Sequence, residues 1–166
     1  KTCVAYYSRS GNTKKAAEYL AGKLNAKVIA LNDQTNYQGV IGFLKGGMRA
    51  SLGIKAKLDT ATYQEISTFD RIVLATPIRA GKATPAINAV LSNVDFRGKA
   101  VYVLTTQADP ECKGTEIRKA FYQKAIETKM GQLVELYSLY GSSPGATASS
   151  DEMAERVDRG VVIEVE

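Results

Sequence analysis

The six residues SRSGNT, at positions 8–13, are rich in hydrogen-bond donors and follow the apolar run VAYY. Hydroxyls come from Ser8, Ser10 and Thr13, and Asn12 adds an amide. In a turn between a strand and a helix, the first backbone N–H groups of the helix lack partners and the helix dipole adds partial positive charge, so phosphate can bind there. Gly11 lets the backbone approach an anion closely. The alternative is an ordinary turn in which Ser10 or Asn12 only caps a helix.

The absence of histidine among the 166 residues excludes several kinds of active site. Ser-His-Asp and Cys-His nucleophile pairs, zinc sites built on histidine and an imidazole general base all need that side chain. The two cysteines, Cys3 and Cys112, fit neither a metal-binding spacing nor a disulfide framework. We therefore expect ordinary packing or exposure of both thiols in a reducing compartment.

The length and composition predict a single domain, residues 1–166, because 45% hydrophobic residues suffice for one core in a chain too short for two ordinary domains. No apolar stretch approaches the roughly 18 to 20 residues of a membrane span, and no signal-peptide core is evident, so we expect a soluble, cytoplasmic protein. The net charge of +5 and the pI near 9.1 favour anionic partners or acidic protein surfaces. Nucleic acid is not expected, because no clustered basic face with aromatic residues is evident.

Apolar runs and helical stripes alternate along the chain, and five runs predict strands at 3–7, 26–31, 71–77, 99–106 and 132–140. Because the central runs are apolar throughout and helical segments separate them, we expect an α/β fold in which helices cover both faces of a five-stranded parallel sheet. Ligands of such sheets bind beyond the carboxyl ends of the strands. The candidate site therefore comprises a first loop at 8–13, a second at 77–84 and a third at 107–114.

Capping residues and helical spacing predict the helices between these strands. Thr84 and Pro85 form an N-cap and first-turn pair, and SSDE at 149–152 is a capping box that opens a last helix. The final VVIEVE could finish as a strand, and a helix interrupted by glycines is expected within 40–52. The expected core-facing stripes are Ala17, Leu20, Ala21 and Leu24 in the first helix, and Ile117, Ala120, Phe121 and Ala125 in the helix after the fourth strand.

The first loop resembles the phosphate loop of the flavodoxin family, whose pattern is hydroxyl, any residue, hydroxyl, Gly, any residue, Thr, and it lacks the Gly-Lys-Ser/Thr of a Walker A loop. The resemblance implies a flavodoxin-like three-layer sandwich with strand order 2-1-3-4-5, of the short-chain type because no long insertion splits the fifth strand. It also implies flavin mononucleotide (FMN) as cofactor, with its phosphate held by neutral donors rather than by Lys or Arg salt bridges. The cofactor-binding residues expected here are Ser8, Arg9, Ser10, Gly11, Asn12 and Thr13.

The segment TPIRAG, residues 76–81, is similar to the second flavin loop of the family, often Thr/Ser-Pro, then Val or Ile, an aromatic, Ala and Gly. Arg79 stands where many relatives have an aromatic side chain that stacks on the flavin ring. The chain has no Trp, so stacking must come from the guanidinium, from Ile78 or from a Tyr elsewhere. By the resemblance, the peptide at Gly81 can flip to hydrogen-bond N5 of reduced flavin. The expected cofactor-binding residues are Thr76, Pro77, Ile78, Arg79, Ala80 and Gly81.

Arg79 and Lys82 would favour the anionic reduced flavin if they lie near its ring. A unit charge roughly 6 Å away, at an effective dielectric constant of about 20, is worth on the order of 3 kcal/mol before exposure and salt reduce it, so the effect on a one-electron potential is on the order of 100 mV at most. We therefore expect a less negative reduction potential than in acidic flavodoxins. The alternative is that both cations are ordinary solvated surface charges.

The third loop occupies the position of the family's third flavin-contacting loop, after the fourth strand and before a helix. By this resemblance, backbone groups of four residues would reach the flavin edge, and Gly114 would permit the turn into the helix. These four residues are Thr106, Gln107, Ala108 and Asp109. The alternative is a connecting loop without a role in binding.

A phosphatase is a rival interpretation, because Cys3 with Arg9 and Ser10 has the Cys, five residues, Arg, Ser/Thr spacing of low-molecular-weight tyrosine phosphatases, and Asp109-Pro110 could supply their acid. The strand-like VAYY argues against it, because it holds Cys3 a strand's length from Arg9. A response-regulator receiver would need acidic residues after the first strand, where this chain has hydroxyls.

Two functions are compatible with an FMN protein of this family. An electron carrier docks to redox partner proteins, whereas an NAD(P)H-dependent oxidoreductase reduces a quinone or similar acceptor. A cationic run could meet an acidic partner or a nicotinamide phosphate, or be only a solvated helix face; it consists of Lys45, Arg49, Lys55 and Lys57. Electron transfer is the favoured prediction, and no catalytic residue and no metal site are expected.

Overall fold

The computed structural model describes residues 1–32, 57–78 and 83–166 of the chain. Several of the predictions lie outside these residues. They are the helix within 40–52, the roles of Arg79, Ala80, Gly81 and Lys82 in the second loop, and the cations Lys45, Arg49 and Lys55.

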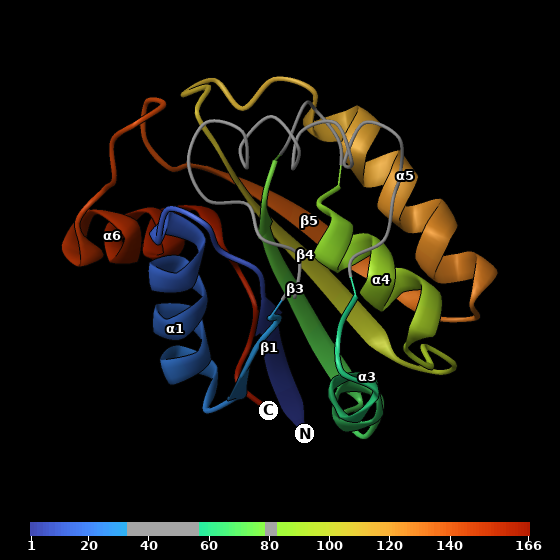
Figure 1. Cartoon of the computed structure of the whole chain (residues 1–166). Helices are drawn as coiled ribbons and strands as arrows, with labels where there is room; N and C mark the ends of the chain where they lie inside the picture. Colours follow the sequence, from blue (N-terminus) through green and yellow to red (C-terminus); the bar gives the residue numbers. More distant parts are fainter. Residues whose placement is uncertain (33–56, 79–82) are drawn as a thin grey trace.

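A five-stranded sheet with all neighbouring strands parallel forms the centre of the structure (Figure 1). The strands are β1 (Thr2–Tyr6), β2 (Lys27–Ala30), β3 (Arg71–Pro77), β4 (Ala100–Gln107) and β5 (Gln132–Tyr140). Their order is β2-β1-β3-β4-β5, which confirms the predicted α/β fold and strand order. Each strand falls within one residue or two of the range predicted for it, because an unbroken apolar run is a strong signal for a buried strand.

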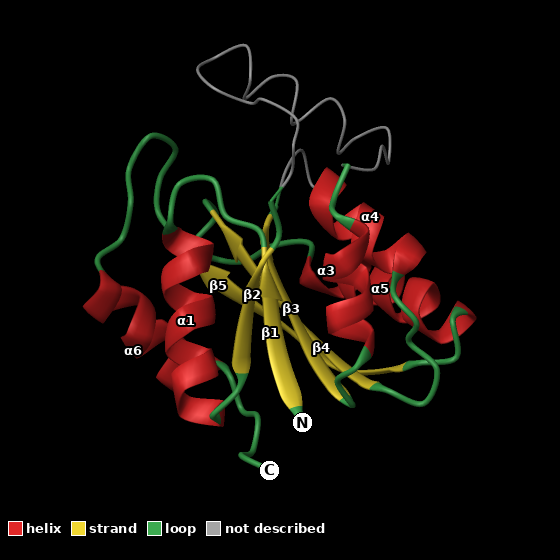
Figure 2. Cartoon of the chain, turned by 60° about the horizontal axis from the view of Figure 1, so that its bottom comes forward, coloured by secondary structure: helices red, strands yellow, loops and turns green. Residues whose placement is uncertain are grey.

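Helices cover both faces of this sheet: α1 and α6 lie on one side, and α3, α4 and α5 on the other (Figure 2). They span α1 (Asn12–Leu24), α3 (Thr60–Ser67), α4 (Pro85–Asn93), α5 (Thr115–Thr128) and α6 (Ser150–Gly160). Side chains of β3 alternate between the two cores, with Ile72 and Leu74 in the core beneath α4, and Val73 and Ala75 in the core beneath α1. All four are fully buried, which explains why the sequence of β3 is apolar on both faces.

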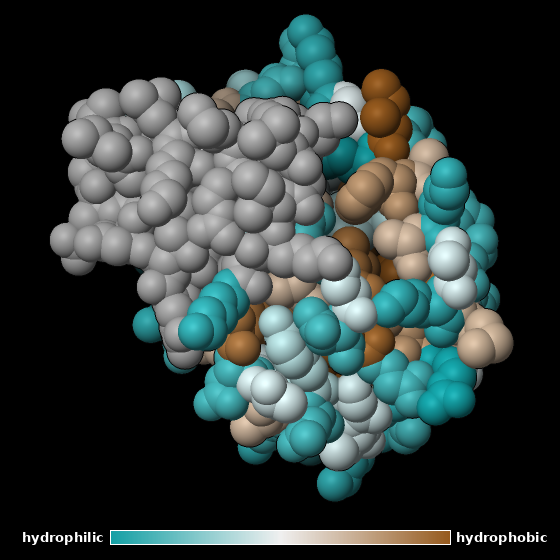
Figure 3. Space-filling model, turned by 45° about the vertical axis from the view of Figure 1, so that its right-hand side comes forward, coloured by the Kyte–Doolittle hydropathy of each residue, from teal (hydrophilic) through white to brown (hydrophobic). Residues whose placement is uncertain are grey.

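The face that α5 presents to the core differs from the prediction. Ile117 and Phe121 were expected inside, but their exposed fractions are 79% and 49%. The buried residues of the helix are Tyr122 and Ile126, which also lie four positions apart and therefore form an equivalent stripe. Because both stripes contain an aromatic and an aliphatic side chain at the same spacing, the packing of the helix against the core decides which stripe is buried. Figure 3, which brings the α5 side forward, shows hydrophobic side chains among the polar surface of this part of the molecule.

The last helix begins as predicted, because Ser149 accepts a hydrogen bond from the N–H of Glu152 while the Glu152 carboxylate accepts one from the N–H of Ser149. After α6, the segment 161–166 is not a strand. Side chains of the sheet hold it instead, since the Tyr137 hydroxyl donates to the carbonyl of Val162 and the Arg71 guanidinium to that of Glu164. Within the described ranges, no helix is both long enough and apolar enough to cross a membrane.

Candidate functional site

The three loops singled out in the sequence meet at the carboxyl edge of the sheet. This follows from the strand order, because β1 and β4 flank β3, and their last residues lie side by side. Hydrogen bonds continue beyond the strands: the N–H of Tyr7 donates to the carbonyl of Ala75 at 3.0 Å, and that of Ile78 donates to the carbonyl of Thr106, also at 3.0 Å. The described residues of the first, second and third loops are therefore neighbours, as predicted (Figure 1).

The first loop ends in a helix start that no side chain caps. Gly11 is the N-cap residue of α1 with φ of +100°, a conformation that favours glycine, and its N–H donates to Ser8 Oγ at 3.2 Å. A Cβ at Gly11 would meet no other atom within 4 Å, so the space above the turn is open. Ser10 is exposed, Arg9 is half-buried, and no acidic residue occurs in the first turn of α1. The local field thus suits an anion.

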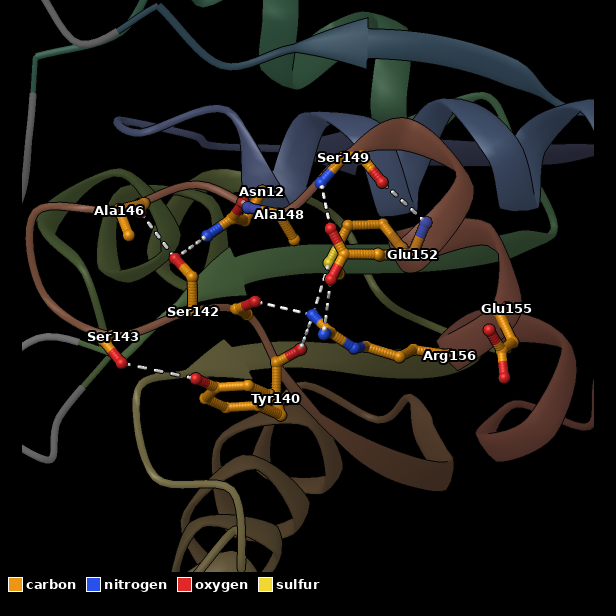
Figure 4. Close-up of polar contacts among 12 residues, drawn as sticks. Asn12, Tyr140, Ser142, Ser143, Ala146, Ala148, Ser149, Glu152, Glu155 and Arg156 are labelled. Atoms are coloured by element: carbon orange, nitrogen blue, oxygen red, sulfur yellow. Dashed lines mark hydrogen bonds and ion pairs between the residues drawn. The ribbon is translucent and has the colours of Figure 1, made fainter.

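Asn12, the first residue of α1, has a bracing contact that the sequence reasoning missed. Its side chain is buried and donates to Ser142 Oγ at 2.8 Å, and its oxygen accepts from the N–H of Ala148 at 2.9 Å (Figure 4). Both partners belong to the segment 141–149, between β5 and α6. The Asn12 amide, which was expected as a phosphate donor, therefore ties the first loop to this segment.

Arg156 of α6 supports the same segment from beneath (Figure 4). Its Nη1 donates to the carbonyls of Tyr140 at 3.0 Å and Gly141 at 2.6 Å, and the guanidinium lies 4.9 Å from the centre of the Tyr140 ring. Glu152, one helical turn earlier, pairs with it at 3.4 Å. These contacts satisfy carbonyls at the end of β5 that have no strand partner on the outer side of the sheet.

The first and third loops are joined by a pair of threonine hydroxyls. Thr13 Oγ1 and Thr106 Oγ1 lie 2.7 Å apart, and the two residues are only 2% and 4% exposed. Thr13 lies in the first turn of α1 and Thr106 near the end of β4. The pair therefore spans the end of β3, which separates their strands.

A second hydroxyl pair holds the ends of the second loop. Thr76 Oγ1 lies 2.9 Å from Thr84 Oγ1, both residues are buried, and the Thr76 hydroxyl also lies 3.1 Å from the carbonyl of Pro77. Thr84 is the N-cap residue of α4 with Pro85 at the first position, as predicted, but its hydroxyl makes no capping bond. The Thr84 hydroxyl pairs with the Thr76 hydroxyl instead, and this pair forms a clasp that links the two ends of the segment between β3 and α4.

The third loop is organised by a carboxylate. Asp109 Oδ1 and Oδ2 accept hydrogen bonds from the N–H groups of Glu111 and Lys113, each at 3.0 Å, and these bonds hold the pKa of Asp109 below its usual value. Its carbonyl accepts from the N–H of Cys112 at 3.0 Å. The loop ends at Gly114, whose φ of +83° and position as N-cap of α5 fit the expected turn into the helix. Asp109 is half-buried, and its carboxylate accepts hydrogen bonds from N–H groups of its own loop.

Arg118 is a cation at this edge that the sequence reasoning missed. Its Nη2 donates to Gln107 Oε1 at 2.6 Å and to the carbonyl of Lys113 at 2.7 Å, so it connects both ends of the third loop. Burial lowers the pKa of this guanidinium, which remains charged at neutral pH. Because its bond occupies the oxygen of the Gln107 amide, the NH2 group of that amide is directed away from Arg118. Ala108, next in the chain, is exposed.

The phosphatase interpretation is wrong. Cys3 lies within β1, is fully buried, and burial raises the pKa of its thiol to about 12. A thiolate nucleophile needs a lowered pKa and access to substrate. Among the described residues, no cluster of acidic or cysteine side chains could hold a metal ion.

Comparisons with known proteins agree with the fold of the chain. A sequence model of the family described as flavodoxin matches residues 1–139. No curated protein gives a significant sequence match.

Solved structures of other proteins share the fold over most of the chain. A proposed flavoprotein from Bacteroides uniformis has a TM-score of 0.68 at 19% identity, covering 95% of this chain and 97% of its own. A flavoprotein from Lactobacillus acidophilus in complex with FMN has a TM-score of 0.63 at 17% identity, covering 83% and 92%. Oxidised flavodoxin 2 from Bacillus cereus has a TM-score of 0.56 at 18% identity, covering 93% of each chain. At these identities the likeness concerns the fold alone.

Proposed function

We propose that this chain, which belongs to the flavodoxin family, binds FMN at the junction of its three loops and transfers electrons between redox partner proteins. A cytoplasmic location is part of the proposal, because two unpaired thiols are typical of a reducing compartment. The net charge of +5 favours acidic partner proteins.

The uncapped start of α1 is the observation on which FMN binding chiefly rests. In α3 and α6 a side chain of the N-cap residue, Asp59 or Ser149, accepts a hydrogen bond from the first turn. The starts of α4 and α5 also lack a side-chain cap, but α4 begins with Pro85, which has no N–H, and the Arg118 guanidinium lies against Gly114 at the start of α5. In α1 the N-cap is Gly11 and no side chain takes this role, so the N–H groups of the first turn remain donors for an external acceptor. A phosphate group matches them in charge and in number of acceptor oxygens, and the exposed Ser10 hydroxyl adds a further donor.

The flavin ring would lie beside the second and third loops. Ile78 and Gln107 are half-buried at the ends of β3 and β4, and Ala108 is exposed, so these residues offer apolar contact and an amide donor on one side of the turn that would hold the phosphate. The carbonyls of Thr106 and Gln107 already accept from Ile78 and from Gly141, which limits them to a second bond each. Bound FMN would supply reversible one- and two-electron transfer.

Charge near the third loop would influence the reduction potential. Arg118 is fixed beneath the loop by two hydrogen bonds and stays positive at neutral pH, so it would stabilise a negative charge that develops on the flavin during reduction. Asp109 opposes this effect, but its carboxylate is directed at two N–H groups of its own loop. Arg79 and Lys82, proposed from the resemblance alone, would act in the same direction as Arg118.

The purified protein provides a direct test. Apoprotein is titrated with FMN while flavin fluorescence is recorded, and the loaded protein is then treated without oxygen with NADH, with NADPH and with dithionite. Saturable quenching, together with bleaching by dithionite but not by NADH or NADPH, is the expected result. Apoprotein that takes up no FMN would overturn cofactor binding. Bleaching by NADH or NADPH alone would overturn the carrier in favour of the oxidoreductase.

A further inference from the structure

Thr106 is the residue at which the three loops are connected. Its hydroxyl pairs with that of Thr13 in the first loop at 2.7 Å, and its carbonyl accepts from the N–H of Ile78 in the second loop at 3.0 Å. It directly precedes the third loop, and the carbonyl of Gln107 accepts from the N–H of Gly141 at 2.8 Å. Thr106 is only 4% exposed, so water does not compete freely for its hydroxyl.

The two kinds of contact at Thr106 have different consequences. The bond to Ile78 is a backbone bond and continues the ladder between β3 and β4, so a change of side chain leaves it in place. The bond to Thr13 depends on the side chain. It joins α1 to a strand that is not a neighbour of β1, so the sheet ladder does not duplicate it. The hydroxyl of Thr106 therefore positions the first turn of α1 relative to the other two loops.

We propose that Thr106 is a positioning residue that sets the selectivity of the site for a phosphorylated flavin over the same flavin without phosphate. This inference rests on the proposed function, because it assumes that a flavin phosphate lies at the start of α1. Loss of the hydroxyl removes the direct bond between the first turn of α1 and the end of β4, while the Asn12 bonds to the segment 141–149 and the backbone bonds of Ile78 and Gln107 remain. Binding of the phosphate is then weakened and contacts to the ring are preserved.

The experiment compares two ligands, FMN and riboflavin, in fluorescence titrations of apoprotein. The Thr106→Val variant keeps the shape of the side chain and removes the hydroxyl. Its Kd for FMN is expected to rise about tenfold, while its Kd for riboflavin stays within about twofold, because one buried hydrogen bond to a positioning group is typically worth about a factor of ten. The Thr106→Ser variant, which retains the hydroxyl, is expected to recover most of the selectivity for FMN.

Thr105→Val is a matched control in the same strand. Thr105 is 1% exposed and its hydroxyl lies 2.9 Å from Ser138 Oγ in β5, away from the first loop. This variant also loses a hydroxyl pair, which is partly buried, yet its ratio of FMN to riboflavin affinity is expected to match that of the unaltered protein. A general effect of lost stability would instead change both variants alike.

A double substitution tests whether the effect runs through Thr13. When Thr13 already carries the change to Val, Thr106→Val is expected to leave the affinity ratio unchanged, whereas independent effects would multiply. Independent effects, or an equal loss for both ligands in Thr106→Val, would overturn the proposal. If that variant does not fold, Thr106→Ala is measured in its place, and an unchanged ratio there overturns it too. Unaltered apoprotein that binds neither flavin refutes the proposed function itself, a different outcome from either of these.

Discussion

Substitutions of Asn12 allow the contribution of this residue to stability to be measured separately from its contribution to anion binding. Asn12→Ala removes two hydrogen bonds and leaves the N–H of Ala148, a residue only 5% exposed, without its acceptor. Two bonds at about 1 kcal/mol each, with an added penalty for the orphaned donor, give a loss of about 2–3 kcal/mol in the free energy of unfolding. With an unfolding entropy of about 2.1 cal/mol/K per residue, this lowers Tm by about 6–9 °C for a chain of 166 residues.

The Asn12→Asp variant gives a sharper comparison, because it should be more stable than Asn12→Ala but bind FMN more weakly. A carboxylate still accepts from Ala148 and lies in the first turn of α1, where a negative charge is favourable by about 0.3–1 kcal/mol, so this variant should be more stable than Asn12→Ala. The same charge repels a phosphate, so its affinity for FMN should be the lower of the two.

Urea unfolding of the apoprotein and FMN titration measure these two orders. The reasoning is refuted if the free energy of unfolding of Asn12→Ala lies within about 0.5 kcal/mol of that of the unaltered protein. It is also refuted if the variant with the higher stability is also the one with the higher affinity for FMN.

Three further predictions concern the loops themselves. Gly11→Ala forces a Cβ into a φ of +100° and should cost about 1–2 kcal/mol and weaken FMN binding, whereas Gly22→Ala within α1 should be neutral or stabilising by up to about 1 kcal/mol; urea unfolding compares the two. Arg118→Met should lower FMN affinity and make the reduction potential more negative by on the order of 20–40 mV, with Arg118→Lys intermediate, as measured by anaerobic titration against a reference dye. A potential unchanged in Arg118→Met contradicts this. Asp109 has a pKa lowered from 3.8, so its contribution to stability is present above that value and is lost as the pH falls through the folded-state pKa. The difference in unfolding free energy between the unaltered protein and Asp109→Asn should therefore shrink as the pH is lowered below 3.8, and a constant difference contradicts the role of the carboxylate.

The strands and the place of the site could be predicted from the sequence because their signals are local. The run from Ile72 to Ala75 is apolar at every position, and both faces are buried. The strand order then places the loop ends together. The face of α5 was not predictable in the same way, because the stripe through Phe121 and the stripe through Tyr122 have the same spacing, and only the packed structure distinguishes them.

The bracing residues of the site were missed for another reason. Asn12 meets Ser142, a partner 130 positions away, and nothing in the sequence near either residue indicates the pair. Arg118 and Arg156 resemble ordinary charged residues of helix surfaces. Arg118, however, donates to a backbone carbonyl of the third loop, and Arg156 donates to two carbonyls at the end of β5. The order of the strands could be expected from the resemblance, but the hydrogen bonds between their loops follow only from the folded chain.

The clasp between Thr76 and Thr84 bears on how this protein can change over evolutionary time. The two hydroxyls link residues eight positions apart, so the segment between them leaves β3 and enters α4 at set points. Substitutions within that segment, such as a cation in place of an aromatic residue, can then alter the chemistry of the site without altering the scaffold. We expect segments from related proteins to be exchangeable between these threonines at little expense in folding stability, so that the clasp defines a natural boundary for grafting.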